Sequence, residues 1–168
     1  MKLFQTLYRE LDRIIYWGGI VAGVFIIITT GMIFYEIVSR SFFNAPTSWA
    51  TELSIYAIIG SCFIGAAYAV RANAHIKVDL LLHNVPVSMR KGMLIISSIL
   101  GFLFSLTFTW FGWEHVMQSM ELGFTSSSLL RIPMYLPVML LPIGGILLCF
   151  SFLLQCIDYM NGKGEELE

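Results

Sequence analysis

Charged residues are scarce in this sequence. Asp, Glu, Lys and Arg make up only 12% of its 168 residues, and 57% are hydrophobic, whereas an ordinary soluble domain carries about 25% charged residues. Four stretches of 18 to 26 residues hold no charge at all: Ile14–Tyr35, Leu53–Val70, Gly92–Trp113 and Ile132–Ile157. A bilayer core about 30 Å thick needs roughly 20 helical residues to cross it.

The sequence therefore predicts an all-α integral membrane protein with four transmembrane helices. We expect a single membrane domain over residues 1–168, with spans over about 14–38, 50–70, 92–114 and 132–157. Soluble buried helices rarely exceed about 14 residues, so four stretches of this length do not fit a soluble core. Neither long loop could form a soluble domain of its own.

Sequence patterns that carry chemistry are also missing. The three cysteines, Cys62, Cys149 and Cys156, lie inside predicted spans and form no C-x-x-C pair, so we interpret them as buried structural thiols rather than a redox or zinc motif. The chain has no H-E-x-x-H, G-x-S-x-G, P-loop or G-x-G-x-x-G pattern, and its predicted spans hold no histidine that could bind haem. We expect no enzymatic activity, no cofactor and no nucleic-acid partner.

Basic residues are distributed unequally between the two sides of the predicted bundle. Eight of the ten Lys and Arg residues fall on the side of the termini, while only Arg40 and Arg131 fall on the other. Because positive charge stays in the cytoplasm, both termini are expected to be cytoplasmic. Apolar residues at helical spacing within residues 1–13 also predict a short amphipathic helix lying at the interface before the first span.

Three charged residues lie at the predicted outer ends of the first two spans. They are Glu36, Arg40 and Glu52. We predict that Arg40 lies between the two carboxylates and holds the helix ends together, because such a set satisfies its own charges. A proton or ion relay is the alternative interpretation, since ionisable groups near the membrane are functional candidates.

The second predicted span is rich in small residues, which allow helices in lipid to approach closely. Gly65, Ala66 and Ala67 are the candidates for contact with another subunit, and packing within the bundle is the alternative. In the fourth span, Pro133 is expected in the first turn, with Pro137 and Pro142 bending the helix. Gly123 is expected to end the third helix.

A histidine and aspartate series follows the second span. His75, Asp79 and His83 are spaced four residues apart, which on a helix would align three possible metal ligands. Asn73 before them and Pro86 after them leave little room for a regular helix. We therefore favour a helix-end or partner contact over a metal site.

Two runs of residues are more specific than these features. One is Tyr35–Pro46 followed by Ser48–Glu52, and the other is Gly65–Arg71 followed by His75–Leu81. In this order the motifs resemble the small, DctQ-type membrane subunit of tripartite ATP-independent periplasmic (TRAP) transporters. Together with the features above they identify these structural or partner-interface candidates: Glu36, Arg40, Asn44, Trp49, Glu52, Gly65, Arg71, His75, Asp79 and Pro133.

The resemblance implies a multi-pass protein of the bacterial inner membrane. Its partners would be membrane lipids, a large membrane subunit bound stably and a periplasmic substrate-binding protein bound transiently. Transport would be a symport, usually with sodium, of an organic acid such as a C4-dicarboxylate or sialic acid. The small subunit would brace the large one, and because the chain ends at Glu168 we expect it to be separate from that subunit.

Two other classes of protein remain as alternatives. A self-contained four-helix proton-coupled exporter would need Glu36 as its membrane carboxylate, although this residue lies near a span end beside Arg40. A haem or quinone membrane anchor would need the intramembrane histidines that are missing. The sequence leaves open the substrate, the coupling ion, the helix faces that meet a partner, and whether Glu36, Arg40 and Glu52 help dock the binding protein.

Overall fold

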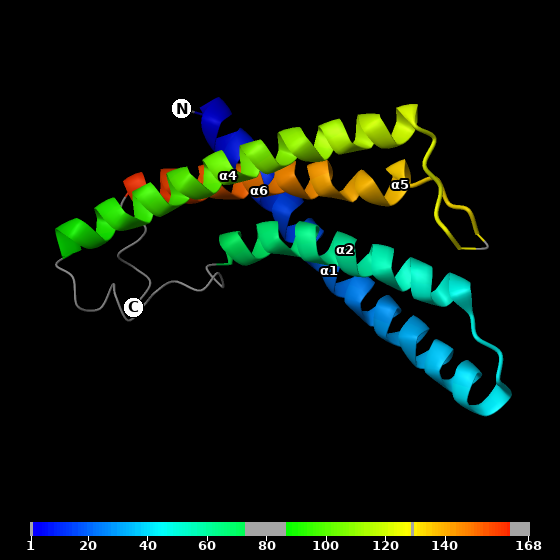
Figure 1. Ribbon diagram of the computed structural model, residues 1–168. Helices are drawn as coiled ribbons and strands as arrows, with labels where there is room; N and C mark the ends of the chain where they lie inside the picture. Colours follow the sequence, from blue (N-terminus) through cyan, green and yellow to red (C-terminus); the bar gives the residue numbers. More distant parts are fainter. Residues whose placement is uncertain (1, 73–86, 129, 162–168) are drawn as a thin grey trace.

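The computed structural model describes residues 2–72, 87–128 and 130–161, and these form an all-helical bundle (Figure 1). Its elements are α1 (Lys2–Phe43), α2 (Ser48–Arg71), α4 (Val87–Glu121), α5 (Tyr135–Val138) and α6 (Leu140–Met160). Four segments are long and apolar enough to cross a membrane: Gln5–Phe43, Ser48–Arg71, Met89–Glu121 and Tyr135–Met160. The predicted fold class and the four spans are confirmed. His75, Asp79 and His83 lie outside the described residues.

The helices are arranged as two antiparallel pairs. α1 pairs with α2, α4 pairs with α6, and α2 packs against α6 to join the pairs. Figure 1 shows the α1–α2 pair diverging from α4 and α5 towards the end where α1 turns into α2. The core therefore lies between α2 and α6, and large parts of α1 and α4 face outward.

The first helix is longer than expected and continuous. α1 runs from Lys2 to Phe43 without a break, so the N-terminal segment continues directly into the first span, and its position at the interface stays a prediction. The physical reason is that no proline or glycine lies between Lys2 and Trp17, where a break would be needed. Nothing in the local sequence competes with continued helix.

A compact turn joins α1 to α2. Asn44 adopts a left-handed conformation with φ 49°, which asparagine tolerates better than most residues. The Ser39 carbonyl accepts a hydrogen bond from the Ala45 N–H at 3.2 Å, and the Ser39 hydroxyl donates to the Ala45 carbonyl at 2.7 Å. These bonds satisfy the end of α1 and reverse the chain within four residues.

The third long helix ends at the residue expected. Gly123 has φ 60°, its N–H donates to the Met120 carbonyl at 3.3 Å, and the Phe124 N–H donates to the Ser119 carbonyl at 3.3 Å. This pair of bonds is the Schellman motif that closes a helix C-terminus. The prediction for Gly123 is confirmed.

The fourth span is interrupted near its start. α5 ends at Val138 and α6 begins at Leu140, so the break falls at Met139, between Pro137 and Pro142. Proline lacks the N–H that would continue the helix ladder, which explains the predicted irregularity. Pro133, expected in the first turn, instead pairs with Thr125 in an isolated β-bridge two residues before α5.

Glycines allow the closest helix contacts inside the bundle. A Cβ added to Gly65 would lie 3.3 Å from the Cβ of Ala22 on α1, and Ala22 and Ala67 are only 4% and 1% exposed. A Cβ added to Gly144 on α6 would lie 2.5 Å from the Cβ of Phe63 on α2. Gly65 thus takes part in packing within the bundle, and its contact with another subunit stays a prediction.

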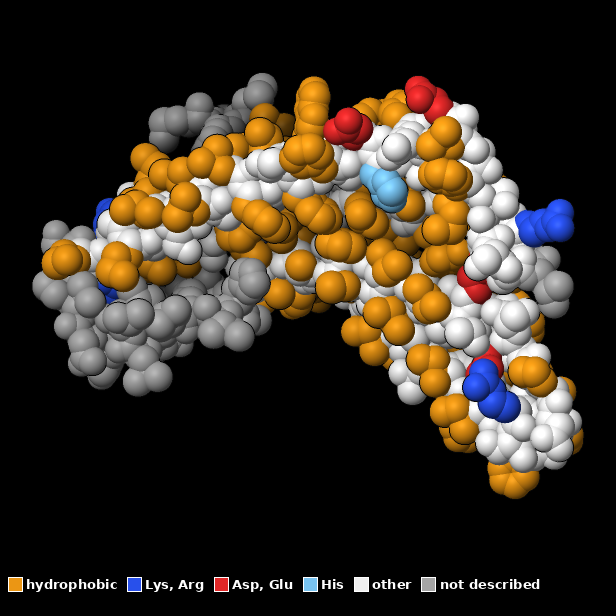
Figure 2. Space-filling model, viewed as in Figure 1, with side chains coloured by type: hydrophobic (Ala, Val, Ile, Leu, Met, Phe, Trp, Pro, Cys, Tyr) orange, Lys and Arg blue, Asp and Glu red, His pale blue; other side chains and the backbone are white. Residues whose placement is uncertain are grey.

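The outer surface of the bundle is apolar. Figure 2 shows hydrophobic side chains covering most of the visible face, with charged side chains along its margins. Trp110 on α4 is 74% exposed and Ile27 on α1 is 73% exposed. Cys62, expected to be buried, is exposed on α2. A surface of this kind requires lipid or another membrane protein around it.

Candidate functional site

Polar and charged side chains bind one another near the ends of the helices in three groups, two of which are built around the buried carboxylates of Glu36 and Glu52. We name them the Glu36 cluster (Glu36, Arg40, Thr47 and Thr51), the Glu52 cluster (Glu52, Tyr56 and Ser128) and the Arg71 cluster (Tyr8, Asp12, Arg71 and Asp158). Removing a charge from water is costly unless it is paired and hydrogen-bonded. Each cluster meets that requirement with residues from different elements.

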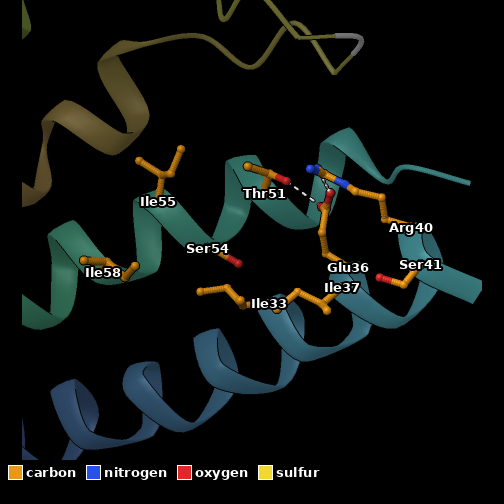
Figure 3. Close-up of a pocket in the computed structure, with 9 residues that line it drawn as sticks. All are labelled: Ile33, Glu36, Ile37, Arg40, Ser41, Thr51, Ser54, Ile55 and Ile58. Atoms are coloured by element: carbon orange, nitrogen blue, oxygen red, sulfur yellow. Dashed lines mark hydrogen bonds and ion pairs between the residues drawn. The ribbon is translucent and has the colours of Figure 1, made fainter.

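The Glu36 cluster joins α1 to α2. Arg40, one turn further along α1, forms an ion pair with Glu36 Oε1. Thr51 of α2 donates its hydroxyl to Glu36 Oε2 at 2.5 Å, and Thr47 donates to the same oxygen at 3.3 Å. Figure 3 shows the three side chains of Glu36, Arg40 and Thr51 converging between the two helices. Both carboxylate oxygens of Glu36 are therefore occupied.

Glu52 belongs to a different cluster from Glu36, so the prediction that Arg40 lies between the two carboxylates is wrong. Tyr56 donates its hydroxyl to Glu52 Oε1 at 2.7 Å, and Ser128 donates to Oε2. Successive residues of a helix point about 100° apart, so Thr51 faces α1 while Glu52 faces the loop that follows α4. Glu52 thereby fastens α2 to that loop.

The loop that Glu52 holds is itself well ordered by hydrogen bonds. The Ser126 N–H donates to the Ile132 carbonyl at 2.8 Å, and the Met134 N–H donates to the Phe124 carbonyl at 2.8 Å. Arg131 adopts φ 45° within it, a conformation that costs energy for a residue with a Cβ. Pro133, one of the candidate residues, lies in this loop and not in a helix.

Asn44 and Trp49 lie beside the Glu36 cluster. Asn44 forms the turn after α1, as described above. The Trp49 ring is 5.9 Å from the Tyr35 ring, measured between centroids, and Trp49 is 41% exposed. Aromatic side chains with one apolar and one polar edge suit the membrane–water boundary, so we expect this pair to lie at the level of the boundary on α1 and α2.

The Arg71 cluster joins three helices at the opposite end of the bundle. Arg71 Nε donates to Asp12 Oδ1 of α1 at 2.5 Å, and Arg71 Nη1 donates to Asp158 Oδ2 of α6 at 2.5 Å. Arg71 Nη2 donates to the Tyr8 hydroxyl, whose own proton reaches Asp158 at 2.7 Å. Arg71 is 18% exposed and Asp158 is 14% exposed, so this is a largely buried network.

Sequence reasoning identified Arg71 but missed its partners Tyr8, Asp12 and Asp158. A signal was present: Asp12 comes just before the first charge-free stretch, Arg71 just after the second and Asp158 just after the fourth. In an up-and-down bundle these three positions fall at the same end. A charge at each such position is a recognisable sign of an end cluster.

A groove lies between α1 and α2 next to the Glu36 cluster. Its volume is about 320 Å³. Figure 3 shows the lining residues, which are Ile33, Glu36, Ile37, Arg40, Ser41, Thr51, Ser54, Ile55 and Ile58. The groove is thus apolar along most of its length and charged at the helix-end side.

This arrangement is suited to holding helices in place. Between the clusters the spans carry no Asp, Glu, Lys or Arg: none lies between Arg13 and Glu36, or between Leu53 and Val70. Within the described residues no group of three His, Cys, Asp or Glu side chains could hold a metal ion. The charged groups of the three clusters lie near helix ends, where they bind other side chains of the chain.

These observations define the class: a multi-pass membrane protein whose helices are tied together at both ends. The family is shown by comparison with known proteins. The model of the family described as tripartite ATP-independent periplasmic transporters, DctQ component, matches residues 29–161. The chain belongs to this family and is a small permease subunit of a TRAP transporter in the bacterial inner membrane, as the sequence motifs predicted.

Individual relatives agree with the family. The C4-dicarboxylate TRAP transporter small permease protein DctQ of Rhodobacter capsulatus is 31% identical over 105 residues, which are 62% of this chain and 46% of that protein. The sialic acid TRAP transporter permease protein SiaT of Haemophilus influenzae is 27% identical over 156 residues, 92% of this chain and 24% of that protein. The chain thus spans about half the length of the first relative and about a quarter of the second.

A further relative matches over most of its length. The sialic acid TRAP transporter small permease protein SiaQ of Vibrio cholerae is 22% identical over 167 residues, covering 96% of this chain and 88% of that protein. The similarity therefore extends across all four spans. It includes the helix ends at which the polar clusters lie.

Proposed function

We propose that this chain is a non-catalytic scaffold that braces the large membrane subunit of its transporter. The observation that supports this most directly is the location of charge. The charged groups of α1, α2 and α6 that bind helix to helix lie near the helix ends, and the stretches between them are uncharged. Transporters place substrate and ion sites near the middle of the bilayer, so those sites belong to another chain.

The partners follow from this role. The proposed direct partner is the large subunit, which would cover part of the apolar surface of α1 and α4. The proposed transient partner is a periplasmic binding protein that delivers the substrate. We place both termini in the cytoplasm, following the distribution of Lys and Arg, so the turn between α1 and α2 and the loop after α4 face the periplasm.

The proposed cargo is an organic acid of the C4-dicarboxylate or sialic acid type, taken up with an ion, usually sodium. The basis is the naming of relatives as C4-dicarboxylate and sialic acid TRAP transporter subunits. The charge-free stretches of the spans offer no Lys or Arg that could hold such an anion at mid-membrane depth. Specificity would reside in the partner proteins.

Reconstitution into liposomes tests the proposal. The purified chain alone is expected to move no C4-dicarboxylate or sialic acid under a sodium gradient, while the same chain with the large subunit and the binding protein supports uptake. Omitting the small chain from the full set should abolish or strongly reduce uptake. Gradient-driven uptake by the small chain alone would overturn the proposal and favour the exporter class, with Glu36 as its carboxylate.

A further inference from the structure

The groove between α1 and α2 has the two chemical features of a phospholipid site. Its walls are the apolar side chains of Ile33, Ile37, Ile55 and Ile58, and each of the four is at least 41% exposed. Its helix-end side carries the Arg40 guanidinium (Figure 3). An apolar trough in a membrane-spanning surface is filled by an acyl chain or by protein, because water gains no hydrogen bonds there.

The charged end of the groove is held in place by a buried carboxylate. Glu36 has a side chain only 9% exposed, and it holds the Arg40 side chain, which is 65% exposed. The ion pair uses one guanidinium nitrogen of Arg40, whereas a guanidinium has five N–H donors arranged in a fork that matches phosphate oxygens. Because most of the Arg40 side chain is exposed, donors that Glu36 does not use are open to a ligand in the groove, which Arg40 lines together with Ser41.

The length and the level of the groove suit the upper part of one acyl chain. From Ile33 to Arg40 along α1 is seven residues, or roughly 10 Å at the rise of an α-helix. Arg40 lies next to the end of α1, and we expect Trp49 nearby to lie at the membrane boundary. A lipid phosphate at Arg40 would therefore sit at headgroup depth while its acyl chain ran down the isoleucine walls.

We propose that this groove binds a phospholipid of the leaflet on the Arg40 side, with its phosphate on the Arg40 guanidinium and one acyl chain between α1 and α2. The proposal goes beyond the bracing role and does not depend on it. A bound lipid would fill the groove between α1 and α2. The groove lies in the part of the α1–α2 pair that diverges from α4 and α5 (Figure 1). The lipid would act as part of the wall of the bundle.

A photoactivatable lipid tests this directly. The purified TRAP complex is reconstituted with phosphatidylglycerol carrying a diazirine midway along one acyl chain, irradiated, digested and mapped by mass spectrometry. We expect labels concentrated on the α1 and α2 peptides that line the groove. Ile33→Trp, which adds a bulky ring to the wall while leaving the Glu36 cluster intact, should reduce that labelling about tenfold.

A matched variant and a second probe make the test specific. Ile143 on α6 is 44% exposed, against 41% for Ile33, and lies outside the groove, so Ile143→Trp should leave the labelling unchanged. A diacylglycerol probe, which lacks phosphate, should label the groove about tenfold less, as expected for loss of a charge-assisted hydrogen bond. Arg40→Gln should reduce phosphatidylglycerol labelling to the same level.

Two results would overturn the proposal. One is labelling that follows exposure over all helices, including α4, and does not respond to Ile33→Trp. The other is strong crosslinking of an Ile33→Cys variant to the large subunit without groove labelling by lipid, which would show that protein occupies the groove.

Discussion

Arg71 is the residue whose removal should destabilise the bundle most. It contacts Asp12 of α1 and Asp158 of α6 from the end of α2, so Arg71→Ala removes the cation shared by three helices. Breaking a fully buried ion pair costs about 3–5 kcal/mol. Asp12 is 46% exposed and contributes little on its own, so most of the loss comes from the Asp158 contact. We expect a destabilisation of about 2–4 kcal/mol.

The assay is thermal denaturation of the purified complex in detergent, followed by the loss of the intact peak in size-exclusion chromatography. One kcal/mol shifts the melting temperature by about 2–4 °C for a chain of this size, so Arg71→Ala should lower it by roughly 5–15 °C. Arg13→Ala is the matched control. Arg13 pairs with Glu10 at 3.7 Å, but both side chains are more than half exposed, so its loss should cost under about 1 kcal/mol.

A rescue experiment separates unpaired charge from lost packing. The triple variant Arg71→Met, Asp12→Asn, Asp158→Asn removes the charges together and should recover most of the stability that Arg71→Ala loses, because replacing a whole buried ion network is often neutral. The melting temperature of Arg71→Lys should lie between those of the wild type and Arg71→Ala. Lysine keeps the positive charge but lacks the planar guanidinium that contacts three partners at once. The reasoning is refuted if Arg71→Ala lowers the melting temperature no more than Arg13→Ala does.

Three further predictions concern the other contacts. Gly144→Leu should prevent assembly, measured as loss of co-purified large subunit, because its Cβ would lie within 2.5 Å of α2, whereas Gly23→Leu, which meets nothing within 4 Å, should assemble normally. Ser128→Ala removes a hydrogen bond to Glu52 and should speed limited proteolysis within residues 122–134. An unchanged rate would mean that the loop's own backbone hydrogen bonds are enough to keep it ordered. Thr51→Val removes a 2.5 Å bond across α1 and α2 and should increase the spin-label distance spread between them, whereas Thr30→Val, at an exposed hydroxyl bonded within its own helix, should not.

The spans and the helix ends were predictable because they depend on local composition. Charge-free stretches indicate membrane crossing whatever the tertiary structure, and Gly123 ends a helix through a backbone conformation that few residues accept. Each of these signals requires only the neighbouring sequence. The same logic identified Pro137 and Pro142 as sources of irregularity in the fourth span.

The partners of the charged residues were not predictable in the same way. Glu52 and Thr51 are adjacent in sequence, yet the helix turns one towards α1 and the other towards the loop after α4. The rotation of α2 about its own axis decides whether Thr51 or Glu52 faces Arg40. The spacing of apolar residues hardly constrains that rotation when a helix is hydrophobic all round. Gly65 was ambiguous for the same reason, since small residues suit internal and intersubunit contacts equally.

The Glu36 cluster and the Arg71 cluster together determine how α1 is tilted in the membrane. On α2, Thr51 and Arg71 are separated by 20 residues, or roughly 30 Å, which matches the bilayer core of about 30 Å. Their partners on α1, Glu36 and Asp12, are 24 residues apart, or roughly 36 Å. A helix that meets both ends must lean, and Figure 1 shows α1 crossing the other helices obliquely. Because either cluster alone would allow α1 to stand straighter, disrupting one end should alter the exposed face of α1 along its whole length, and with it the surface that the large subunit would cover.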